Sequence, residues 1–170
     1  MPLTIETERL RIREFNMGDA AFIVVLLNTP SWLRFIGDRN VRTIEDATNY
    51  LLNGPIESYR INGFGLSMVE LKEGAVPIGM CGLIKRDTLE DVDIGFAMLP
   101  EYAGKGYGYE SASAIMQYAK KPLGLKRVVA ITDTENNYSI GLLKKLGMEF
   151  EKMVNLYDDK ELMLFGTEIK

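Results

Sequence analysis

The sequence contains no histidine and a single cysteine, Cys81. The lack of histidine excludes Ser-His-Asp and Cys-His catalysis and any histidine-ligated metal site, and we expect no metal ion. One cysteine cannot build an intramolecular disulfide framework, and this composition suits a reducing compartment. Any general base must therefore be a carboxylate, a lysine, a tyrosine or a water molecule.

Long apolar runs and basic blocks are also missing. No run approaches the roughly 20 residues of a membrane span, and the N-terminal segment MPLTIETERLRIREF is too charged for a signal peptide. With 20 Lys and Arg against 24 Asp and Glu, the net charge is −4, which disfavours nonspecific binding to nucleic acid. We therefore expect a cytoplasmic protein that binds neither membranes nor nucleic acid, and that is a monomer or a homodimer.

What the chain does contain is an ordinary globular composition, with 46% hydrophobic residues among 170 and no linker. This predicts one mixed α/β domain over residues 1–170. Alternating and apolar runs predict strands at 9–15, 64–71, 76–85, 91–98 and 127–132 and a final hairpin of 148–154 and 161–169. Helices are predicted at 19–27, 43–52 and 137–146, with a further turn at 56–60 and an amphipathic helix carrying Ala112, Ile115, Met116 and Ala119.

The segment AGKGYGYE, Ala103 to Glu110, has a glycine at every second position between a predicted strand and a predicted helix. A flexible loop is one interpretation, and a phosphate cradle made of backbone N–H groups at a helix start is the other. A Rossmann fingerprint fails because Ser111 stands where its third glycine belongs. A P-loop fails because Gly106, not Ser or Thr, follows Lys105.

Three ordered stretches, TERLRIREF, DIGFAMLPEYAGKGYGYES and ENNYSIGLLKKLGMEF, resemble the GNAT N-acetyltransferase superfamily, in particular its RimJ/RimL-like branch. The resemblance implies a twisted sheet of six or seven strands with about four helices, splayed between 91–98 and 127–132. It also implies acetyl-CoA as cosubstrate, with its pyrophosphate on the glycine loop and its pantetheine on the strand before it. The donor-binding residues would be Phe96, Ala97, Met98, Gly104, Lys105, Gly106, Tyr107, Gly108, Tyr109 and Asn136.

One departure from the family pattern lies at the head of the loop, where Ala103 replaces an arginine or glutamine. Because backbone donors hold the anion, we expect weaker anchoring of the loop and retained binding. Lys105 is a candidate for added charge, and a solvated lysine is the alternative. The basic residues Lys120, Lys121, Lys126 and Arg127 are candidates for the CoA 3′-phosphate, and a solvated face is again the alternative.

For catalysis, the resemblance implies that Ser139 protonates or orients the CoA thiolate and that Asn136 binds the pantetheine. Helix capping is the alternative for both. Leu143 stands where many members have a tyrosine acid, and Tyr138 is a weaker substitute for it. Asp93 is the candidate base on strand 91–98, and a surface aspartate or a water relay is the alternative.

The acceptor should contact the region 30–60 and the terminal hairpin. Trp32, Phe35 and Phe64 are candidate pocket walls, and core packing is the alternative for each. The sequence thus predicts an N-acetyltransferase that transfers acetyl to a primary amine, a protein N-terminus or a small molecule, in a ternary complex. A noncatalytic acyl-CoA sensor is the alternative, motivated by Ala103 and Leu143. The sequence does not identify the amine.

Overall fold

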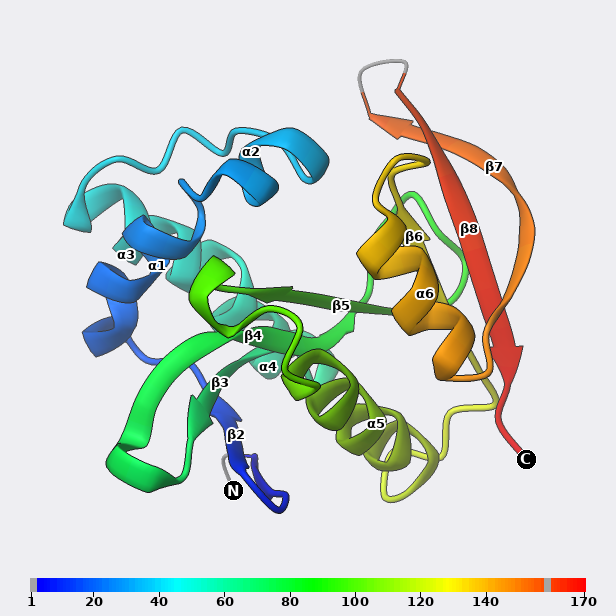
Figure 1. The fold of residues 1–170 in the computed structure, drawn as a ribbon, viewed down its shortest axis with the longest axis horizontal. Coiled ribbons are helices and arrows are strands. Elements are labelled where there is room, and N and C mark those ends of the chain that lie inside the picture. The colour runs from blue at the N-terminus through cyan, green and yellow to red at the C-terminus, as the bar shows by residue number, and fades with distance from the viewer. Residues whose placement is uncertain (1–2, 158–159) are drawn as a thin grey trace.

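The computed structural model describes residues 3–157 and 160–170, and within them eight strands form one mixed sheet (Figure 1). The strands lie in the order β1-β2-β3-β4-β5-β6-β8-β7. All neighbours are antiparallel except β5 and β6, which are parallel. Their bounds are β1 Thr4–Glu6, β2 Leu10–Glu14, β3 Leu66–Leu71, β4 Val76–Ile84, β5 Asp93–Met98, β6 Arg127–Thr132, β7 Glu149–Tyr157 and β8 Lys160–Glu168.

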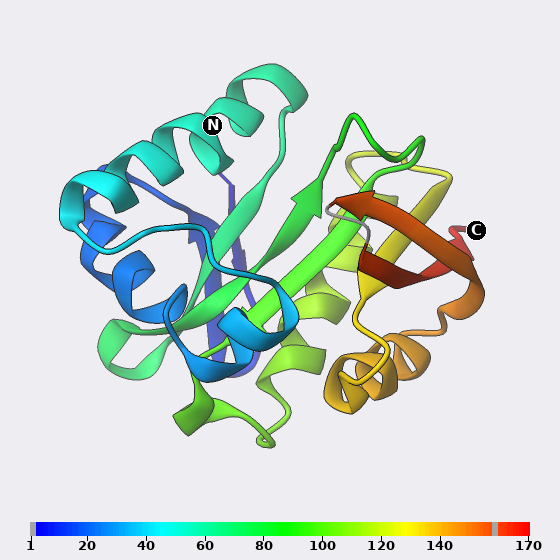
Figure 2. The same cartoon turned by 90° about the horizontal axis from the view of Figure 1, so that it is seen from above.

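Helices cover both faces of this sheet (Figures 1 and 2). Helices α5 and α6 pack on one face, in a core cluster with Ile12 and Ile94, and the four earlier helices pack on the other, with Met68 and Met80. The helices are α1 Ala20–Leu26, α2 Pro30–Phe35, α3 Ile44–Asn53, α4 Pro55–Asn62, α5 Tyr107–Lys120 and α6 Asn137–Lys145. Three 3-10 turns are η1 Met17–Asp19, η2 Glu73–Ala75 and η3 Pro100–Tyr102.

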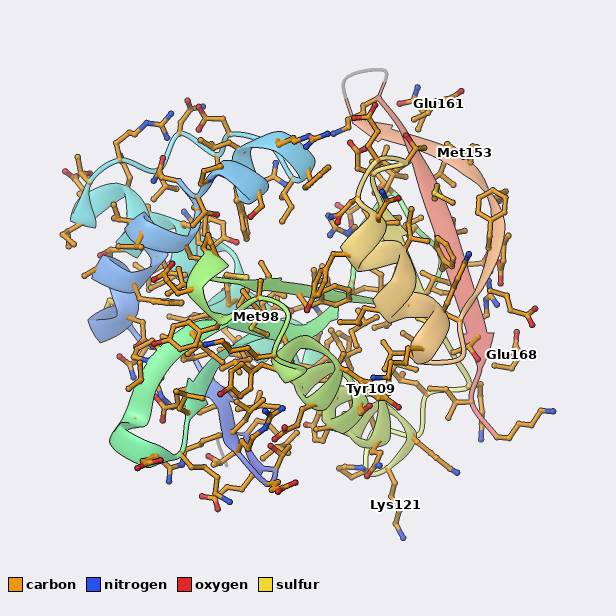
Figure 3. All side chains as sticks on the ribbon, in the orientation of Figure 1. Met98, Tyr109, Lys121, Met153, Glu161 and Glu168 are labelled. Atoms are coloured by element: carbon orange, nitrogen blue, oxygen red, sulfur yellow. The ribbon has the colours of Figure 1, made fainter. Side chains whose placement is uncertain are left out.

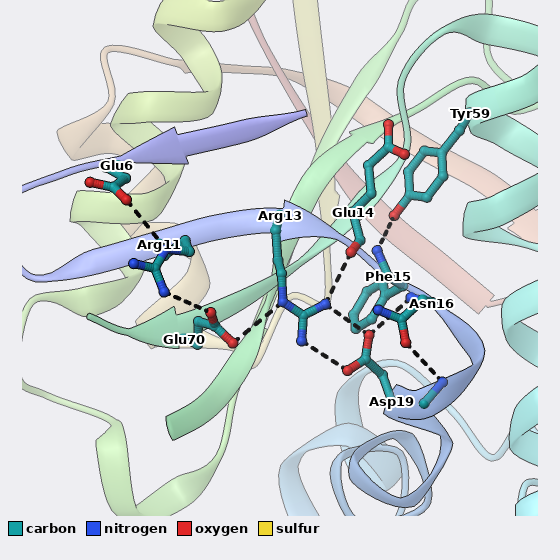
Figure 4. A network of polar contacts seen from close by, with 10 residues as sticks. Glu6, Arg11, Arg13, Glu14, Phe15, Asn16, Asp19, Tyr59 and Glu70 are labelled. Carbon is teal, nitrogen blue, oxygen red and sulfur yellow. Dashed lines mark hydrogen bonds and ion pairs between the residues drawn. The ribbon is translucent and has the colours of Figure 1, made fainter. Parts of the chain in front are cut away.

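Strand β2 shows how the alternating pattern sets the two faces. Its apolar residues Leu10 and Ile12 are fully buried in the α5 cluster. The arginines that alternate with them, Arg11 and Arg13, point to the other face. Both pair with the buried Glu70 of β3 (Figure 4). Arg13 also pairs with Asp19 at 2.9 Å, which ties the sheet to the turn before α1.

The predicted helices at 43–52, 137–146 and around Ala112 are present in the structure. Thr43 caps α3 in a capping box with Asp46. Helix α6 ends before Gly147, whose φ of +88° favours glycine. The apolar stripe of α5 is buried on the sheet, with Ala112, Ile115 and Ala119 at most 1% exposed.

Two elements exceed the prediction, so the described chain has eight strands in place of six or seven and six α-helices in place of about four. Strand β1 has three residues and exists by pairing with β2, which a short window cannot reveal. Helix α2 has six residues, too few for a clear period. Its signal was Thr29 followed by Pro30, an N-cap and a first-turn proline.

The predicted splay lies between β5 and β6. Only Asp93 and Val129 are direct partners, and the N–H of Val129 donates to the carbonyl of Val92 at 3.0 Å. Beyond this pair the two strands diverge, while β5 stays paired with β4 as far as Met98. One edge of the second half of β5 therefore has no neighbouring strand in the described chain.

Candidate functional site

The glycine loop follows β5 and the turn η3 and leads into α5. Gly104 and Gly106 have φ of +74° and +85°, a left-handed region that costs other residues about 1–2 kcal/mol. All four residues from Ala103 to Gly106 are exposed to solvent. Backbone conformation thus explains two of the three glycines, and left-handed residues in such a turn make an anion-binding concavity.

The backbone donors of this loop lack partners. Within the described residues, none of the six N–H groups of residues 104–109 donates a hydrogen bond. The groups on either side do: Ala103 donates to the carbonyl of Pro100 at 3.2 Å, and Glu110 to that of Gly106 at 3.0 Å. Six consecutive free donors at the positive end of a 14-residue helix fit an anionic group.

Gly108 serves a different purpose. A Cβ there would lie 2.3 Å from the Tyr138 hydroxyl and 2.8 Å from a methyl of Leu142. Gly108 therefore lets α5 and α6 approach each other, in addition to its predicted role as a backbone donor. Tyr138 lies against the first turn of α5, and burial raises the pKa of its hydroxyl.

An arginine that the sequence reasoning missed anchors the loop. Arg9, between β1 and β2, donates from Nη1 to the carbonyl of Lys105 at 3.1 Å and from Nε to Glu110 at 2.7 Å. Its guanidinium lies 4.3 Å from the centroid of the Tyr107 ring. Thr7 also donates to Glu110, at 2.5 Å. Glu110 thus joins the β1–β2 turn to α5.

The free edge of β5 carries the residues predicted to bind pantetheine. Met98 is the last residue of β5, and Tyr109 follows in the first turn of α5 (Figure 3). Phe96 and Met98 pack on the α5 face and Ala97 on the opposite face, so their side chains are held and one backbone edge remains free. This edge leads from the glycine loop toward the point where β5 meets β6.

The opposite wall of the splay presents unpartnered hydroxyls. Thr132, at the end of β6, is 6% exposed, and its Oγ1 has no hydrogen-bond partner among the described residues. Ser139, in the first turn of α6, is 7% exposed, and its hydroxyl likewise makes no bond within the described chain. Asn136 caps α6, because its Oδ1 accepts from the Ser139 N–H at 3.1 Å. Capping leaves the amide Nδ2 of Asn136 for other partners.

Asp93 lies where β5 and β6 meet, and it is 1% exposed. The pairing of β5 with β4 is regular from Asp93 to Met98, so no bulge alters the alternation. Asp93 consequently points to the face opposite α5. Burial raises the pKa of its carboxyl, and an ion pair with Arg86 at 2.9 Å opposes that shift. The alternative of a surface aspartate is therefore wrong.

A groove of about 540 Å³ opens beside this point. Its wall includes Val129, the cross-strand partner of Asp93, together with Leu164, the segment 88–91 and residues 151–156. Arg127 stands at its rim and pairs with three carboxylates, those of Asp91, Glu151 and Glu168. These ion pairs hold the Arg127 side chain at the rim of the groove. Lys121, another candidate for the CoA 3′-phosphate, projects at the end of α5 far from the glycine loop (Figure 3).

The three aromatic residues predicted to line an acceptor pocket do not come together. Trp32 is 5% exposed in the core beneath α2, and its indole N–H has no acceptor in the described chain. Phe35 is half-buried and lies 4.6 Å from the guanidinium of Arg34. Phe64 packs against the core on the opposite face of the sheet. Contact between these residues and an acceptor stays a prediction.

Three further features concern the cysteine, the acidic side chains and the length of the helices. Cys81 is a fully buried core residue, and burial raises the pKa of its thiol to about 12. Among residues 3–157 and 160–170, no three acidic or cysteine side chains are grouped so that they could hold a metal ion. None of the helices described is long and apolar enough to cross a membrane.

Comparisons with known proteins agree with this geometry. Residues 9–149 match the acetyltransferase (GNAT) domain family. Two Bacillus subtilis proteins, the uncharacterized N-acetyltransferases YoaA and YnaD, are 28% and 30% identical to this chain. The YoaA match covers 90% of this chain and 86% of YoaA, and the YnaD match covers 86% and 83%.

A similar fold occurs in the ribosomal-protein-S5-alanine acetyltransferase of Vibrio fischeri, with a TM-score of 0.81 and 21% identity. That match covers 98% of this chain and 96% of the other. The mixed fold, with its splay and glycine loop, therefore agrees with the family match over most of the length. The chain belongs to the GNAT acetyltransferase family of enzymes.

Proposed function

We propose that this protein transfers the acetyl group of acetyl-CoA directly to a primary amine in a ternary complex. The observation that carries the proposal is the run of six unpartnered N–H groups at residues 104–109, at the open end of the β5–β6 splay. A pyrophosphate carries two adjacent anionic groups, and such a run of donors suits it without any side-chain cation.

From that cradle, the pantetheine arm would extend along the free edge of β5. Its amides would bond the backbone of residues 96–98 on one side. On the other side, the buried hydroxyl of Thr132 and the Nδ2 of Asn136 would be available as partners. A buried hydroxyl without a partner costs free energy, which a bound amide would offset. Thr132 was not predicted from the sequence, because a threonine in an apolar strand gives no signal of its own.

Asp93 and Ser139 would then act on opposite sides of the thioester. The raised pKa makes Asp93 a stronger base than an exposed aspartate, and it would accept a proton from the acceptor's ammonium group, directly or through water, so that the neutral amine can attack. The amine nitrogen forms a bond to the carbonyl carbon, and the carbon–sulfur bond breaks. The hydroxyl of Ser139, which makes no hydrogen bond within the described chain, would donate to the departing sulfur.

The burial of Cys81 supports a direct transfer of the acetyl group, without an acyl-cysteine intermediate. Its thiol is fully buried and its pKa is raised to about 12, so it is neither accessible nor ionised near neutral pH. An acyl-cysteine intermediate would need the opposite properties. The acetyl group would thus pass from donor to acceptor in one step, with both bound.

The acceptor would reach the thioester from the face that Asp93 and the adjoining groove share. The class we propose is a primary amine, either a protein N-terminus or a small molecule. Relatives in fold that are named as ribosomal-protein acetyltransferases favour a protein N-terminus, as in the RimJ/RimL-like branch. A cytoplasmic location and a monomeric or homodimeric state remain predictions.

The test is thiol release from acetyl-CoA with a panel of amines and N-terminal peptides, with mass spectrometry to identify the acetylated nitrogen. Turnover with at least one acceptor supports the proposal. Tight CoA binding without turnover on any acceptor would favour the alternative of a noncatalytic acyl-CoA sensor. Failure to bind acetyl-CoA would refute both.

A further inference from the structure

Arg9 reaches across the fold to the glycine loop, which lies 96 residues away in the sequence. Its Nε and Nη1 groups are used by Glu110 and by the carbonyl of Lys105. The ion pair with Glu110 raises the pKa of Arg9, so the guanidinium keeps its charge. Its side chain is 42% exposed. It is thus a charged group at the edge of the proposed cradle.

The bond to Lys105 sets the direction of a donor. In a planar trans peptide, the carbonyl of one residue and the N–H of the next point in opposite directions. Because Arg9 holds the Lys105 carbonyl on its own side, the N–H of Gly106 points to the other side. Gly106 is the third of the six residues whose N–H groups have no partner in the described chain. Arg9 therefore fixes the peptide in the middle of the cradle.

The remaining donor of Arg9 lies beside the same residue, on the side of the Lys105 carbonyl. Its Nη2 lies 3.2 Å from where a Cβ on Gly106 would stand, and it bonds no acceptor in the described residues. The family pattern has an arginine or glutamine at the head of the loop, where this chain has Ala103. An arginine therefore reaches this loop from the β1–β2 turn, in addition to the charge of Lys105 within the loop.

We propose that Arg9 is the positioning residue of the phosphate cradle and that it makes the site selective for acyl donors carrying a pyrophosphate. Its main contribution is the orientation of the Gly106 N–H, and its positive charge behind the loop adds a longer-range attraction for the anion. The inference rests on the proposed function, since it assumes that this loop binds CoA. The inference adds to that function that the affinity of the loop for CoA depends on a residue outside the loop.

The experiment measures binding of CoA, 3′-dephospho-CoA and pantetheine to Arg9→Met and Arg9→Lys by calorimetry, with pantetheine measured by displacement of CoA. For Arg9→Met we expect a loss of about tenfold or more for CoA and dephospho-CoA, the scale of a charged hydrogen bond. Pantetheine affinity should not change. Arg9→Lys should lie between, because lysine keeps the charge and loses the fork of donors.

Arg11→Met is the matched control. Arg11 is also a partly exposed arginine with two carboxylate partners, Glu6 and Glu70, and it lies two residues further along the chain. We expect its CoA affinity to equal that of the wild type. Equal CoA affinity of Arg9→Met and wild type would overturn the inference, as would equal losses for CoA and pantetheine.

Two further results separate the possible failures. If Arg9→Met does not fold, Arg9→Lys still tests the inference, because lysine keeps the charge and loses the fork of donors that binds Glu110 and the Lys105 carbonyl together. Unchanged CoA affinity in Arg9→Lys would then overturn it. If the wild type binds no CoA, it is the proposed function that fails.

Discussion

Replacing Gly104 by alanine isolates the backbone conformation of the cradle from its packing. Gly104 has φ of +74°, and no atom of the described chain lies within 4 Å of where its Cβ would stand. The new methyl group would therefore meet no neighbour, and the only cost is that of a left-handed alanine. Gly124, between α5 and β6, provides the matched control, with φ of +67° and equally open surroundings.

The size of the effect follows from the backbone alone. A left-handed conformation costs an L-residue about 1–2 kcal/mol. At Gly104, whose N–H has no partner in the described chain, the exposed loop can relax to another conformation in the free protein. The cost then appears when CoA binds, as an affinity about 5- to 30-fold lower. Gly124 donates to the carbonyl of Lys120 at 3.1 Å, so its cost should appear as lost stability.

The assay pairs CoA calorimetry with urea unfolding for the two variants. Gly104→Ala should weaken CoA binding and leave the free energy of unfolding nearly unchanged. Gly124→Ala should lose about 1–2 kcal/mol of stability and bind CoA normally. Wild-type affinity in Gly104→Ala would refute the claim that the left-handed loop is the anion site.

Three more predictions concern other side chains. Ser139→Ala should lower kcat with little effect on CoA affinity, measured by thiol release, and equal losses would indicate only a binding role. Asp93 has a raised pKa, so between its ordinary value of 3.8 and that raised value the folded state binds more protons. Wild-type stability should then rise relative to Asp93→Asn as the pH falls through that window, and a parallel pair of urea-unfolding profiles would contradict this. Arg127→Met should cost about 1–2 kcal/mol, less in high salt, and leave CoA binding intact, whereas a weaker CoA affinity would point to a phosphate contact.

Much of the fold followed from local patterns. The apolar run 127–132 matches β6 at both ends, and the pairing of Thr43 with Asp46 marked the start of α3. Strand 91–98 begins two residues later than predicted, because Asp91 turns to pair with Arg127 and does not join the sheet. Short-range signals were reliable where a single segment determined the conformation.

The site was predicted only in part, for a physical reason. The glycine spacing located the cradle, since positive φ angles are local. Arg9 could not be found, because only the order of strands in the sheet brings the β1–β2 turn beside α5. In the same way, nothing local reveals that Trp32 and Phe64 pack on opposite faces of the sheet.

Amide exchange followed residue by residue by NMR, with and without CoA, tests the central claim most directly. The account predicts that the N–H groups of residues 104–109 exchange freely in the unliganded protein and become protected when CoA binds, and that pantetheine leaves them unprotected. Protection of these amides before CoA is added, or CoA binding that leaves them exchanging freely, would contradict it.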